Sequence, residues 1–411
     1  MKHYFYKFLV LIPIFLILNS SLLINNCRSQ WLQMNGPSGG LVNCFAVSGT
    51  NIFAGTWNGG VFLSTNNGNS WTAVNNGLTN QYVYSLAVSG TNIFAGTYGG
   101  GVFLSINNGT SWTAVNNGLT NLTVNSLAVS GTNIFAGTNG GVFLSSNNGT
   151  SWTAVNNGLT NQSVLSLAVS GTNIFAGTFG GGVFLSSNNG TSWTAVNNGL
   201  TNLAVASLAV SGTNVFAGTG GGVFLSTNNG NSWTAVNNGL TNQYVYSLAF
   251  SGTNLFAGTS GGVFLSTNNG TSWLNKNQGF NSIPLIDALL ITNNYIFAGT
   301  PYQSVWRRSY TEIIGIQNIS VEIPSSYSLS QNYPNPFNPT TKIKFEVKQA
   351  GIVSIKVFDM LGKEVANIVD KKMEPGTYEA DWNAGAFSSG VYYYTMRAGD
   401  YAETKKLVLI K

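Results

Sequence analysis

The chain has 411 residues, of which only 7% are charged, with 17 Lys and Arg, 12 Asp and Glu, and one His. An ordinary soluble domain is roughly 25% charged. The deficit lies in the middle, because residues 29–275 contain no Asp, Glu, Lys, Arg or His. That stretch lacks catalytic carboxylates, imidazole bases, lysine nucleophiles, acidic metal ligands and the clustered cations that bind phosphates. We therefore expect no enzyme activity, no cofactor, no metal site and no nucleic-acid partner.

Residues 1–29 have the composition of a secretory signal peptide. Lys2 and Lys7 supply the positive start, and the apolar run of residues 8–18 is interrupted by Pro13. This run is short for a membrane span, so an uncleaved anchor is the less favoured alternative. The prediction is Sec export to the periplasm. After cleavage Cys44 would be the only cysteine, which predicts no internal disulfide and a small core residue.

The middle of the chain repeats one unit. The pentapeptide IFAGT, or a close variant of it, recurs at spacings of 40 or 41 residues. Its copies begin at Ile52, Ile93, Ile134, Ile174, Val215, Leu255 and Ile296. A fixed period of this length indicates a solenoid, a propeller or another repeat array.

Each unit is expected to contain four short strands. In the second unit these are residues 82–89, 92–97, 101–105 and 111–116, which are rich in β-branched and aromatic residues and separated by Gly and Asn. No sustained helical period is present. Four strands per unit of about 40 residues is typical of a β-propeller blade, with a parallel β-helix as the alternative.

The two ends of the repeat region predict a closed ring. The last unit stops near Arg307 without its fourth, Trp-bearing strand, whereas residues 31–35 (WLQMN) match residues 71–75 (WTAVN) of the first unit. The N-terminal segment can therefore complete the last blade and remove the exposed sheet edge. We predict an all-β fold in which residues 30–308 form a seven-bladed β-propeller closed by an N-terminal strand.

The turn before each Trp carries a resemblance. Residues 64–71 (STNNGNSW) follow the pattern S-x-[DN]-x-G-x-x-W, which recurs at residues 105–112, 145–152, 186–193, 226–233 and 266–273. The pattern resembles the Asp-box of sialidase-like, sortilin-like and photosystem-assembly-factor-like propellers. Here Asn replaces Asp in every copy, and Asn can make the same bonds to backbone amides. The resemblance implies that the box stabilises the fold and has no catalytic role.

The same resemblance argues against catalysis. Sialidase-like enzymes need an arginine cluster, a Tyr nucleophile and acidic partners, and glycanases need two carboxylates. The first charged candidates after the neutral stretch include Asp287, Arg307, Arg308 and Glu312. We expect these to form a solvated seam toward the next domain.

Positions that vary among the near-identical units indicate a binding face. One set follows the AGT triplet and the other follows GLTN. In an up-and-down blade both sets lie on one face of the disc, and loops that vary on a fixed scaffold commonly contact ligands. The aromatic candidates are Trp57, Tyr98, Phe179, Tyr82, Tyr84, Tyr244 and Tyr246. They could stack on sugars or clasp a peptide, and because neither set is charged, salt should barely affect affinity.

After Arg308 the composition changes, with a predicted linker at residues 309–326 and a small Ig-like β-sandwich at residues 327–411. Its segments 333–339 (YPNPFNP), 357–365, 389–394 and 405–411 resemble the type A C-terminal sorting domain of the type IX secretion system. The resemblance implies export across the outer membrane of certain Gram-negative bacteria, with the secretion machinery as partner. The residues that carry it are Pro334, Asn335, Pro336, Phe337, Gly362, Gly390, Tyr392, Lys405 and Lys406.

The sequence therefore predicts a secreted or cell-surface, non-catalytic binding protein whose ligand is a glycan, a peptide or a surface protein. A structural matrix component that self-associates through its neutral blades is the alternative. A glycoside hydrolase-like enzyme is the least favoured reading, because the neutral stretch lacks the catalytic groups.

Overall fold

The computed structural model describes residues 30–410 apart from Gly39, Thr253, Asn293, Val321 and Ala386. The predicted signal peptide, residues 1–29, lies outside the described residues. Within them, no helix is long and apolar enough to cross a membrane.

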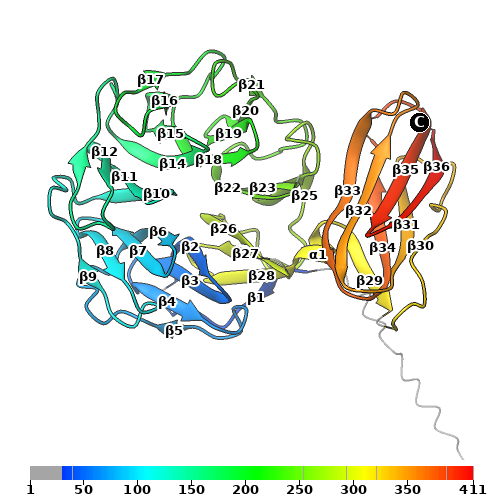
Figure 1. Cartoon of the computed structure of the whole chain (residues 1–411), viewed down its shortest axis with the longest axis horizontal. Coiled ribbons are helices and arrows are strands. Elements are labelled where there is room, and N and C mark those ends of the chain that lie inside the picture. Colours follow the sequence, from blue (N-terminus) through cyan, green and yellow to red (C-terminus); the bar gives the residue numbers. More distant parts are fainter. Residues whose placement is uncertain are drawn as a thin grey trace, which may run out of the picture.

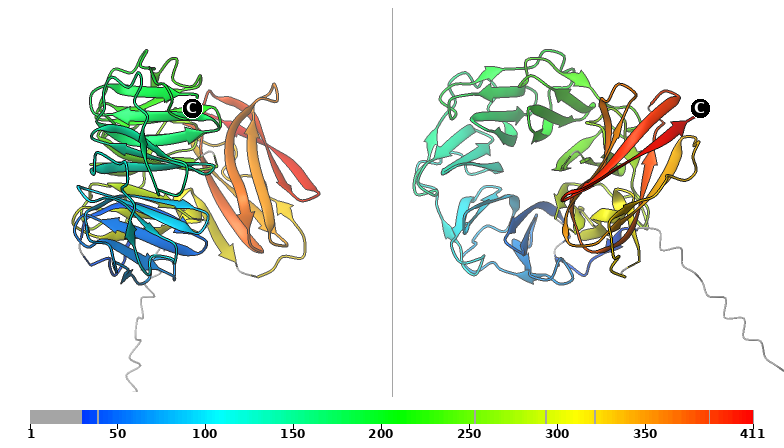
Figure 2. Two further views of the ribbon diagram at one scale, coloured as in Figure 1. Left: turned by 60° about the vertical axis from the view of Figure 1, so that its left-hand side comes forward. Right: turned by 45° about the vertical axis from the view of Figure 1, so that its right-hand side comes forward.

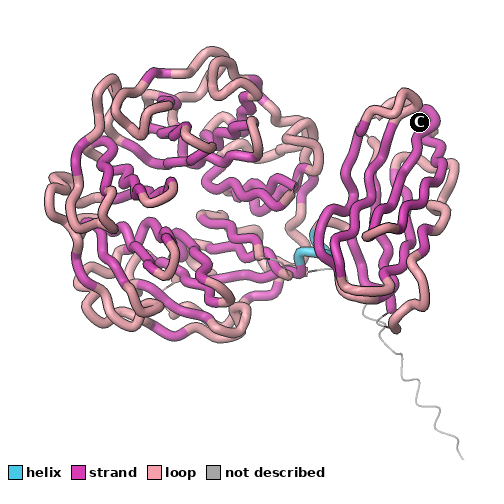
Figure 3. Tube along the Cα trace, viewed as in Figure 1, coloured by secondary structure: helices cyan, strands magenta, loops and turns pink. Residues whose placement is uncertain are grey.

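The described chain forms a ring of antiparallel sheets with a smaller β-sandwich beside it (Figure 1). Seven four-stranded sheets make up the ring, and two further four-stranded sheets make up the sandwich. The tube view shows that strands and loops account for nearly all of both parts (Figure 3). The predicted all-β propeller is confirmed, and the seven sheets of the ring match the predicted number of blades.

In the first six blades the innermost and second strands are the longest, with seven and six residues. The innermost strands are β2 (Val42–Ser48), β6 (Val83–Ser89), β10 (Val124–Ser130), β14 (Val164–Ser170), β18 (Val205–Ser211), β22 (Val245–Ser251) and β26 (Ala288–Ile291). The second strands are β3 (Asn51–Thr56), β7 (Asn92–Thr97), β11 (Asn133–Thr138), β15 (Asn173–Thr178), β19 (Asn214–Thr219), β23 (Asn254–Thr259) and β27 (Tyr295–Gly299). The repeated IFAGT motif is therefore the second strand of every blade.

The outer strands are shorter. The third strands are β4 (Val61–Ser64), β8 (Gly101–Ser105), β12 (Gly141–Ser145), β16 (Gly182–Ser186), β20 (Gly222–Ser226), β24 (Gly262–Ser266) and β28 (Val305–Ser309). The fourth strands are β5 (Thr72–Ala73), β9 (Thr113–Ala114), β13 (Thr153–Ala154), β17 (Thr194–Ala195), β21 (Thr234–Ala235), β25 (Leu274–Asn275) and, in the last blade, β1 (Leu32–Gln33). Each outermost strand is only two residues long and exposed, which limits edge-to-edge pairing with another chain.

The hydrophobic core lies between neighbouring blades. Phe94 of blade 2 (β6–β9) is fully buried and packs in one cluster with Ile134 and Phe143 of blade 3 (β10–β13). The close approach of neighbouring blades also requires a glycine at Gly77, whose φ is +80°. A Cβ there would lie 2.2 Å from the carbonyl oxygen of Trp112 in the next blade. The near-identical sequences follow from this arrangement, since each blade must fit both neighbours.

The Trp residues of five boxes connect blades 2 to 6 to the preceding blade, whereas the indole nitrogen of Trp71 in the first box is buried without a hydrogen-bond partner in the described part of the chain. The indole Nε1 of Trp112 donates a hydrogen bond of 2.7 Å to the carbonyl of Val74, and Trp152 donates in the same way to Val115. Trp193, Trp233 and Trp273 repeat the bond to Val155, Val196 and Val236. We call this repeated bond the indole latch.

The N-terminal strand closes the ring as the sequence predicts. Strand β1 pairs with β28, placing Leu32 opposite Arg307 and Gln33 opposite Trp306. Trp31 is 1% exposed and stacks on Phe280 with ring centroids 5.1 Å apart. Its Nε1 donates to the carbonyl of Lys276 at 2.7 Å, which reproduces the indole latch at the seam.

The Asn boxes are hydrogen-bonded turns. In blade 3, Oδ1 of Asn147 accepts from the hydroxyl of Ser145 at 2.9 Å and from the amide of Ser151 at 3.0 Å. Its Nδ2 donates to the hydroxyl of Ser151 at 2.9 Å, and the next residue, Asn148, has a φ of +56°. The Asn side chain accepts one bond from a backbone amide, as the sequence predicts, and makes two bonds to serine hydroxyls.

Replacing Asn147 with Asp should change stability by less than about 0.5 kcal/mol, because an Asp carboxylate can accept all three bonds once the Ser151 hydroxyl turns to donate. Replacing Asn147 with Leu should cost about 1–2 kcal/mol because the three bonds are lost. Thermal unfolding of the two variants tests this prediction. Equal losses would show that the side-chain bonds do not stabilise the turn.

The segment predicted as a linker has structure of its own. Helix α1 (Tyr310–Ile313) follows β28, and its buried residues Tyr310 and Ile313 belong to the core of the last blade. Strand β29 (Ile316–Ser320) pairs with the sandwich strand β34 (Gly376–Asn383). The structural boundary between propeller and sandwich therefore lies near Gly315, earlier than the sequence-based boundary at residue 327.

The sandwich consists of two antiparallel sheets. One has the order β29-β34-β31-β30, with β31 (Thr340–Val347) and β30 (Ser328–Leu329). The other has the order β33-β32-β35-β36, with β33 (Glu364–Met373), β32 (Gly351–Phe358), β35 (Gly390–Ala398) and β36 (Tyr401–Leu409). One hydrophobic cluster that includes Phe345, Ile355 and Tyr394 fills the space between the sheets.

The sandwich lies beside the last two blades of the ring (Figure 2). The amide Nδ2 of Asn254 donates to the hydroxyl of Tyr310 at 3.0 Å, and Lys371 of β33 lies over the Tyr310 ring at 5.4 Å from its centroid. A cavity of about 330 Å³ between the two parts is lined by Lys276, Asp381 and other residues. Burial lowers the pKa of Lys276 to about 8, with Arg308 lowering it further and Asp381 opposing the shift.

Candidate binding face

The two variable sets lie next to each other, as the blade topology predicts. The backbone amide of Tyr98 donates to the carbonyl of Tyr82 at 2.9 Å, and that of Phe179 donates to Ser163 at 2.9 Å. These loops join second to third strands and one blade to the next, whereas the two-residue hairpin at Gly90 and the Asn boxes lie at the opposite strand ends. The variable positions therefore share one face of the disc.

A β-bulge near the start of the innermost strand directs a further residue to this face. In blade 2, Val83 pairs with Thr97 and Ser85 with Gly96, so Tyr84 is the extra residue. The same register shift occurs in five other blades. Bulges commonly re-aim a side chain beside a functional site. The resulting bulge ring contains Asn43, Tyr84, Asn125, Leu165, Ala206 and Tyr246, with Asp287 at the equivalent place in the last blade.

Four of the predicted aromatic residues form one cluster. The ring centroid of Trp57 lies 5.3 Å from Tyr84, 5.4 Å from Tyr82 and 6.0 Å from Tyr98. Tyr84 also contacts Tyr98 at 5.7 Å, edge to face. Tyr82 and Tyr98 are 39% and 50% exposed, so the cluster presents ring surface to solvent. We call these four residues the Trp57 cluster.

The other three predicted aromatic residues lie apart from this cluster. Tyr244 and Tyr246 occupy the positions of Tyr82 and Tyr84 in blade 6 (β22–β25), but Gly220 and Ser260 stand where blades 1 and 2 have Trp57 and Tyr98. Tyr244 is accordingly 62% exposed. Phe179 of blade 4 (β14–β17) is 66% exposed. The structure therefore brings together four of the seven candidates.

Asp287 does not lie in a seam toward the next domain, contrary to the sequence-based expectation. It directly precedes Ala288, which pairs with Gly299, just as Tyr84 precedes Ser85, the partner of Gly96. The carboxyl group is half-buried, and this burial raises its pKa to about 6. The face that carries the variable positions therefore has one charged side chain, Asp287, which lies outside the two variable sets.

The remaining charged residues near the end of the ring bond mainly to the propeller itself. Arg307 donates to Oδ1 of Asn69 at 2.9 Å and lies over the ring of Tyr295, 4.4 Å from its centroid. Arg308 is buried and donates to the carbonyl of Lys276 at 2.9 Å. These two arginines hold the closing blade in place, and Glu312 lies in helix α1.

The two ends of the sorting resemblance meet in the sandwich. Asn335 accepts from the amide of Val408 at 2.9 Å through Oδ1, and its Nδ2 donates to the carbonyl of Lys406 at 3.2 Å. Phe337 is 2% exposed and its amide donates to the Val408 carbonyl at 3.0 Å. The segment that contains Pro334 and Pro336 therefore lies along the last strand, β36.

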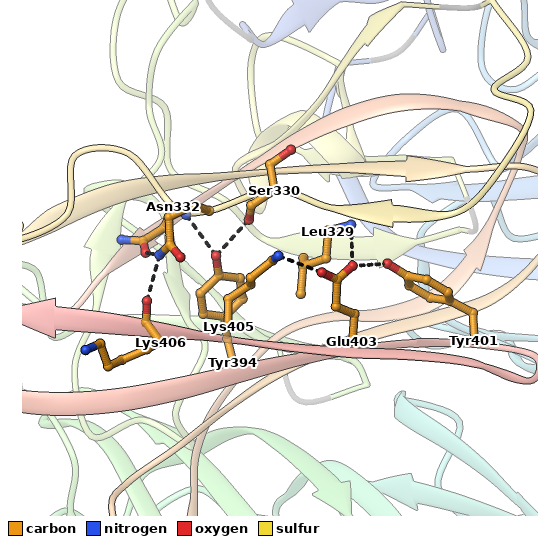
Figure 4. A network of polar contacts seen from close by, with 9 residues as sticks. Leu329, Ser330, Asn332, Tyr394, Tyr401, Glu403, Lys405 and Lys406 are labelled. Carbon is orange, nitrogen blue, oxygen red and sulfur yellow. Dashed lines mark hydrogen bonds and ion pairs between the residues drawn. The ribbon is translucent and has the colours of Figure 1, made fainter.

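Side-chain bonds continue this contact (Figure 4). The hydroxyl of Tyr394 accepts from the amide of Asn332 at 2.8 Å and donates to the carbonyl of Ser330 at 2.7 Å. Lys405 pairs with Glu403 at 2.6 Å, and hydrogen bonds from Lys405 and then Tyr401 lower the pKa of Glu403. Lys405 is thus held by a carboxylate, whereas the Lys406 side chain is exposed.

The remaining sorting residues occupy other parts of the sandwich. Gly362 has a φ of +80° in the turn between β32 and β33. Gly390 begins β35, and the hydroxyl of Tyr392 in that strand donates to the Ser388 carbonyl at 2.8 Å. These residues stabilise the sandwich locally.

Two families match parts of the chain. Residues 331–411 match the secretion system C-terminal sorting domain, and residues 79–198 match the DUF6242 beta propeller domain. No curated protein matches the sequence significantly.

Solved structures match the propeller at low identity. YCF48 from Cyanidioschyzon merolae is 16% identical with a TM-score of 0.56, covering 69% of this chain and 99% of that one. The extracellular domain of a hybrid two-component system from B. thetaiotaomicron is 20% identical with a TM-score of 0.57, covering 79% of this chain and 46% of that one. The GH74 enzyme from Niastella koreensis is 18% identical with a TM-score of 0.50, covering 68% and 43%. At these identities the likeness concerns the fold alone.

The two family matches correspond to the two structural parts of the chain, the ring of blades and the sandwich. The sorting-domain match covers the whole contact between residues 331–337 and β36, and the propeller match lies within the ring. The protein is a β-propeller with a type IX C-terminal sorting domain, and it is exported to be secreted or held at the cell surface.

Proposed function

We propose that this protein is a non-catalytic binding protein of the cell exterior and that its ligand docks on the face that carries the Trp57 cluster. The observation that carries this proposal is the mutual contact of four aromatic rings on exposed loops of two adjacent blades. The residues of blade 5 (β18–β21) that correspond to Tyr82, Tyr84 and Tyr98 are Ala204, Ala206 and Gly220. The aromatic surface is therefore local and does not follow from the repeat.

Partly exposed aromatic clusters suit recognition for a physical reason. Tyr and Trp rings offer a large apolar area with few rotatable bonds, so a ligand gains contact area at a small cost in side-chain entropy. The rings of the Trp57 cluster hold one another in place before any ligand arrives. Such a surface can stack against a sugar ring or an extended peptide, and the ligand classes are accordingly a glycan, a peptide or another surface protein.

The distribution of charge supports a non-catalytic role. Glycoside hydrolysis by the usual routes needs two carboxyl groups within about 5–10 Å of each other. The bulge ring contains one carboxylate, Asp287, and no Asp or Glu precedes it anywhere in the mature propeller. Among the structural relatives, the GH74 protein is an enzyme, whereas YCF48 has been solved bound to D1 peptide. A peptide ligand is thus compatible with a propeller of this architecture.

A self-associating matrix protein is the less favoured proposal. Strand exchange between chains would require sheet edges that can pair. The outermost strands contain two residues each, and those of five blades expose only Thr and Ala side chains. The other two expose one Leu each, Leu274 and Leu32.

The test compares aromatic variants of the mature chain, residues 30–411, on glycan and peptide arrays. The double variant Trp57→Ala, Tyr84→Ala should lose affinity by about tenfold or more, because well-packed aromatic anchors typically contribute 2 kcal/mol or more. Phe179→Ala is the matched control, since it removes a more exposed ring that lies outside the cluster. Equal binding by the double variant and the unmodified protein would reject the proposed face.

A further inference from the structure

Asp287 is the single charged member of the bulge ring and has an aromatic neighbour on one side of it. Around the ring, Tyr246 of blade 6 precedes it, and Asn43 of blade 1 and then Tyr84 of blade 2 follow it. Strand β26 packs against both β22 and β2, so these positions are consecutive in space. We call Tyr246, Asp287, Asn43 and Tyr84 the acidic arc.

The carboxylate of Asp287 has no cationic partner among the described residues. No hydrogen bond or ion pair reaches it there. The strands packed against β26 are β2, β22, β23 and β27, and their titratable side chains are Cys44, Tyr246 and Tyr295. Burial raises the pKa of Cys44 to about 12, and burial followed by Asp287 and Tyr244 raises that of Tyr246. None of these side chains is a cation, so the strands packed against β26 do not compensate the charge.

The amides of the ring are already used by the protein. Nδ2 of Asn43 donates to the Val83 carbonyl at 2.9 Å. Nδ2 of Asn125 donates to the Val164 carbonyl at 2.8 Å and to Oδ1 of Asn139 at 2.9 Å. Leu165 and Ala206 complete the ring without polar side-chain atoms. Within the bulge ring the amide donors of Asn43 and Asn125 are therefore engaged, whereas the carboxylate of Asp287 remains available.

We propose that the acidic arc binds a positively charged side chain, lysine or arginine, of a polypeptide ligand. This inference rests on the proposed binding function and specifies its ligand. The methylene stem of such a side chain can lie along the ring of Tyr246, which is next to Asp287 around the bulge ring, and its cation can meet the Asp287 carboxylate. A long side chain with a cationic end can therefore pack on the aromatic ring and pair with the Asp287 carboxylate. A neutral ligand would cover the ring but leave the carboxylate charge uncompensated.

The charge gives the interaction a defined pH dependence. The folded pKa of Asp287 is raised to about 6, so the free protein loses the carboxylate charge as the pH falls through that value. A bound cation favours the ionised form, and binding therefore lowers this pKa. Affinity should be full at pH 7.5 and decline as the pH falls below about 6. Added salt should also weaken this charged interaction, whereas the sequence-based prediction for the uncharged variable positions is that salt barely affects affinity.

The experiment titrates tetralysine into the mature full chain by calorimetry at low salt, at pH 7.5 and pH 5.0. Asp287→Asn keeps the size of the side chain and removes its charge, and its thermal unfolding is recorded beside that of the unmodified protein. The expected result is a tenfold or greater loss of tetralysine affinity in the variant at pH 7.5. The unmodified protein should lose affinity at pH 5.0, and the variant should show no further loss.

Two further probes test whether the ligand must be positively charged and whether it must be a polypeptide. Tetralysine acetylated at every Nε should not bind the unmodified protein. Equal affinity of Asp287→Asn and the unmodified protein for tetralysine would overturn the inference, as would equal binding of the acetylated peptide. Binding of a glucosamine tetramer in preference to tetralysine would overturn the assignment to a polypeptide. If the arrays show a neutral ligand that requires the Trp57 cluster but not Asp287, this inference fails and the proposed function stands.

Discussion

Replacing Trp31 with Ala is expected to lower the free energy of unfolding of the propeller by about 3–5 kcal/mol. Trp31 is 1% exposed, stacks on Phe280 and donates to the Lys276 carbonyl. Strand β1 contributes two residue pairs with β28, and Trp31 is the largest buried side chain of the closing segment. Its loss also leaves the edge of β28 open to pairing with another chain.

Chemical unfolding followed by tryptophan fluorescence measures this effect, and Leu32→Ala is the control. Leu32 is the next residue in the same segment but is 57% exposed, so its replacement should change stability by about 0.5 kcal/mol or less. If Trp31→Ala were as stable as Leu32→Ala, the N-terminal segment would not be what closes the ring.

Ending the chain after residue 314 is expected to abolish secretion while leaving a folded propeller in the periplasm. This cut removes the whole sandwich, including β29, and keeps helix α1, whose Tyr310 and Ile313 belong to the core of the last blade. The sorting-domain match spans residues 331–411, all of which are removed. Fractionation of the producing bacterium into periplasm, outer membrane and medium measures the outcome.

A chain ended at residue 326 is the informative comparison. It also lacks the sorting domain, but it keeps β29 without its partner β34. An unpaired strand favours aggregation, so this chain should reach lower levels in the periplasm than the one ended at residue 314. Recovery of either truncated propeller from the medium at normal levels would contradict the assignment of the sorting domain.

Local repetition is the reason that so much of the propeller could be predicted. The IFAGT strands, the Asn boxes and the orphan segment around Trp31 each recur in register, so one pattern fixes the whole ring. The sorting domain could also be predicted from the sequence, because the motif around Pro334–Phe337 and the residues of the last strand both resemble one known domain. Its internal pairing, in which Asn335 bonds to Lys406 and Val408, could not be deduced because it joins segments about 70 residues apart in the chain.

The position of Asp287 was missed even though the sequence contained the signal. The IFAGT copies at Leu255 and Ile296 are 296 − 255 = 41 residues apart, and the same step from Tyr246 leads to Asp287. The last unit has diverged just before Asp287, so the loop that leads to this residue no longer resembles the corresponding loops of the other units. The β-bulge was hidden for a different reason, since it depends on the pairing of two strands and leaves only a shift in the apolar alternation.

The segment after β28 illustrates a further limit. Residues 309–326 have a mixed composition, and neither α1, which is four residues long, nor β29 is stable without partners from elsewhere in the fold. Their structure comes from the last blade and from β34, both far away in the sequence.

The indole latch has a consequence for how such a protein can change over generations. Blades 2 to 6 each offer the same indole to the blade before and the same carbonyl to the blade after. Any of these blades can therefore follow any other without a new interface. Duplication or exchange of whole repeat units would reorder the rings and small residues around the binding face while every joint stayed intact. The first and last blades are the exceptions, because the Trp71 indole makes no such bond and the last blade is completed by the N-terminal strand. Asp287 and the closing strand would therefore keep their place as the rest of the face is reshuffled.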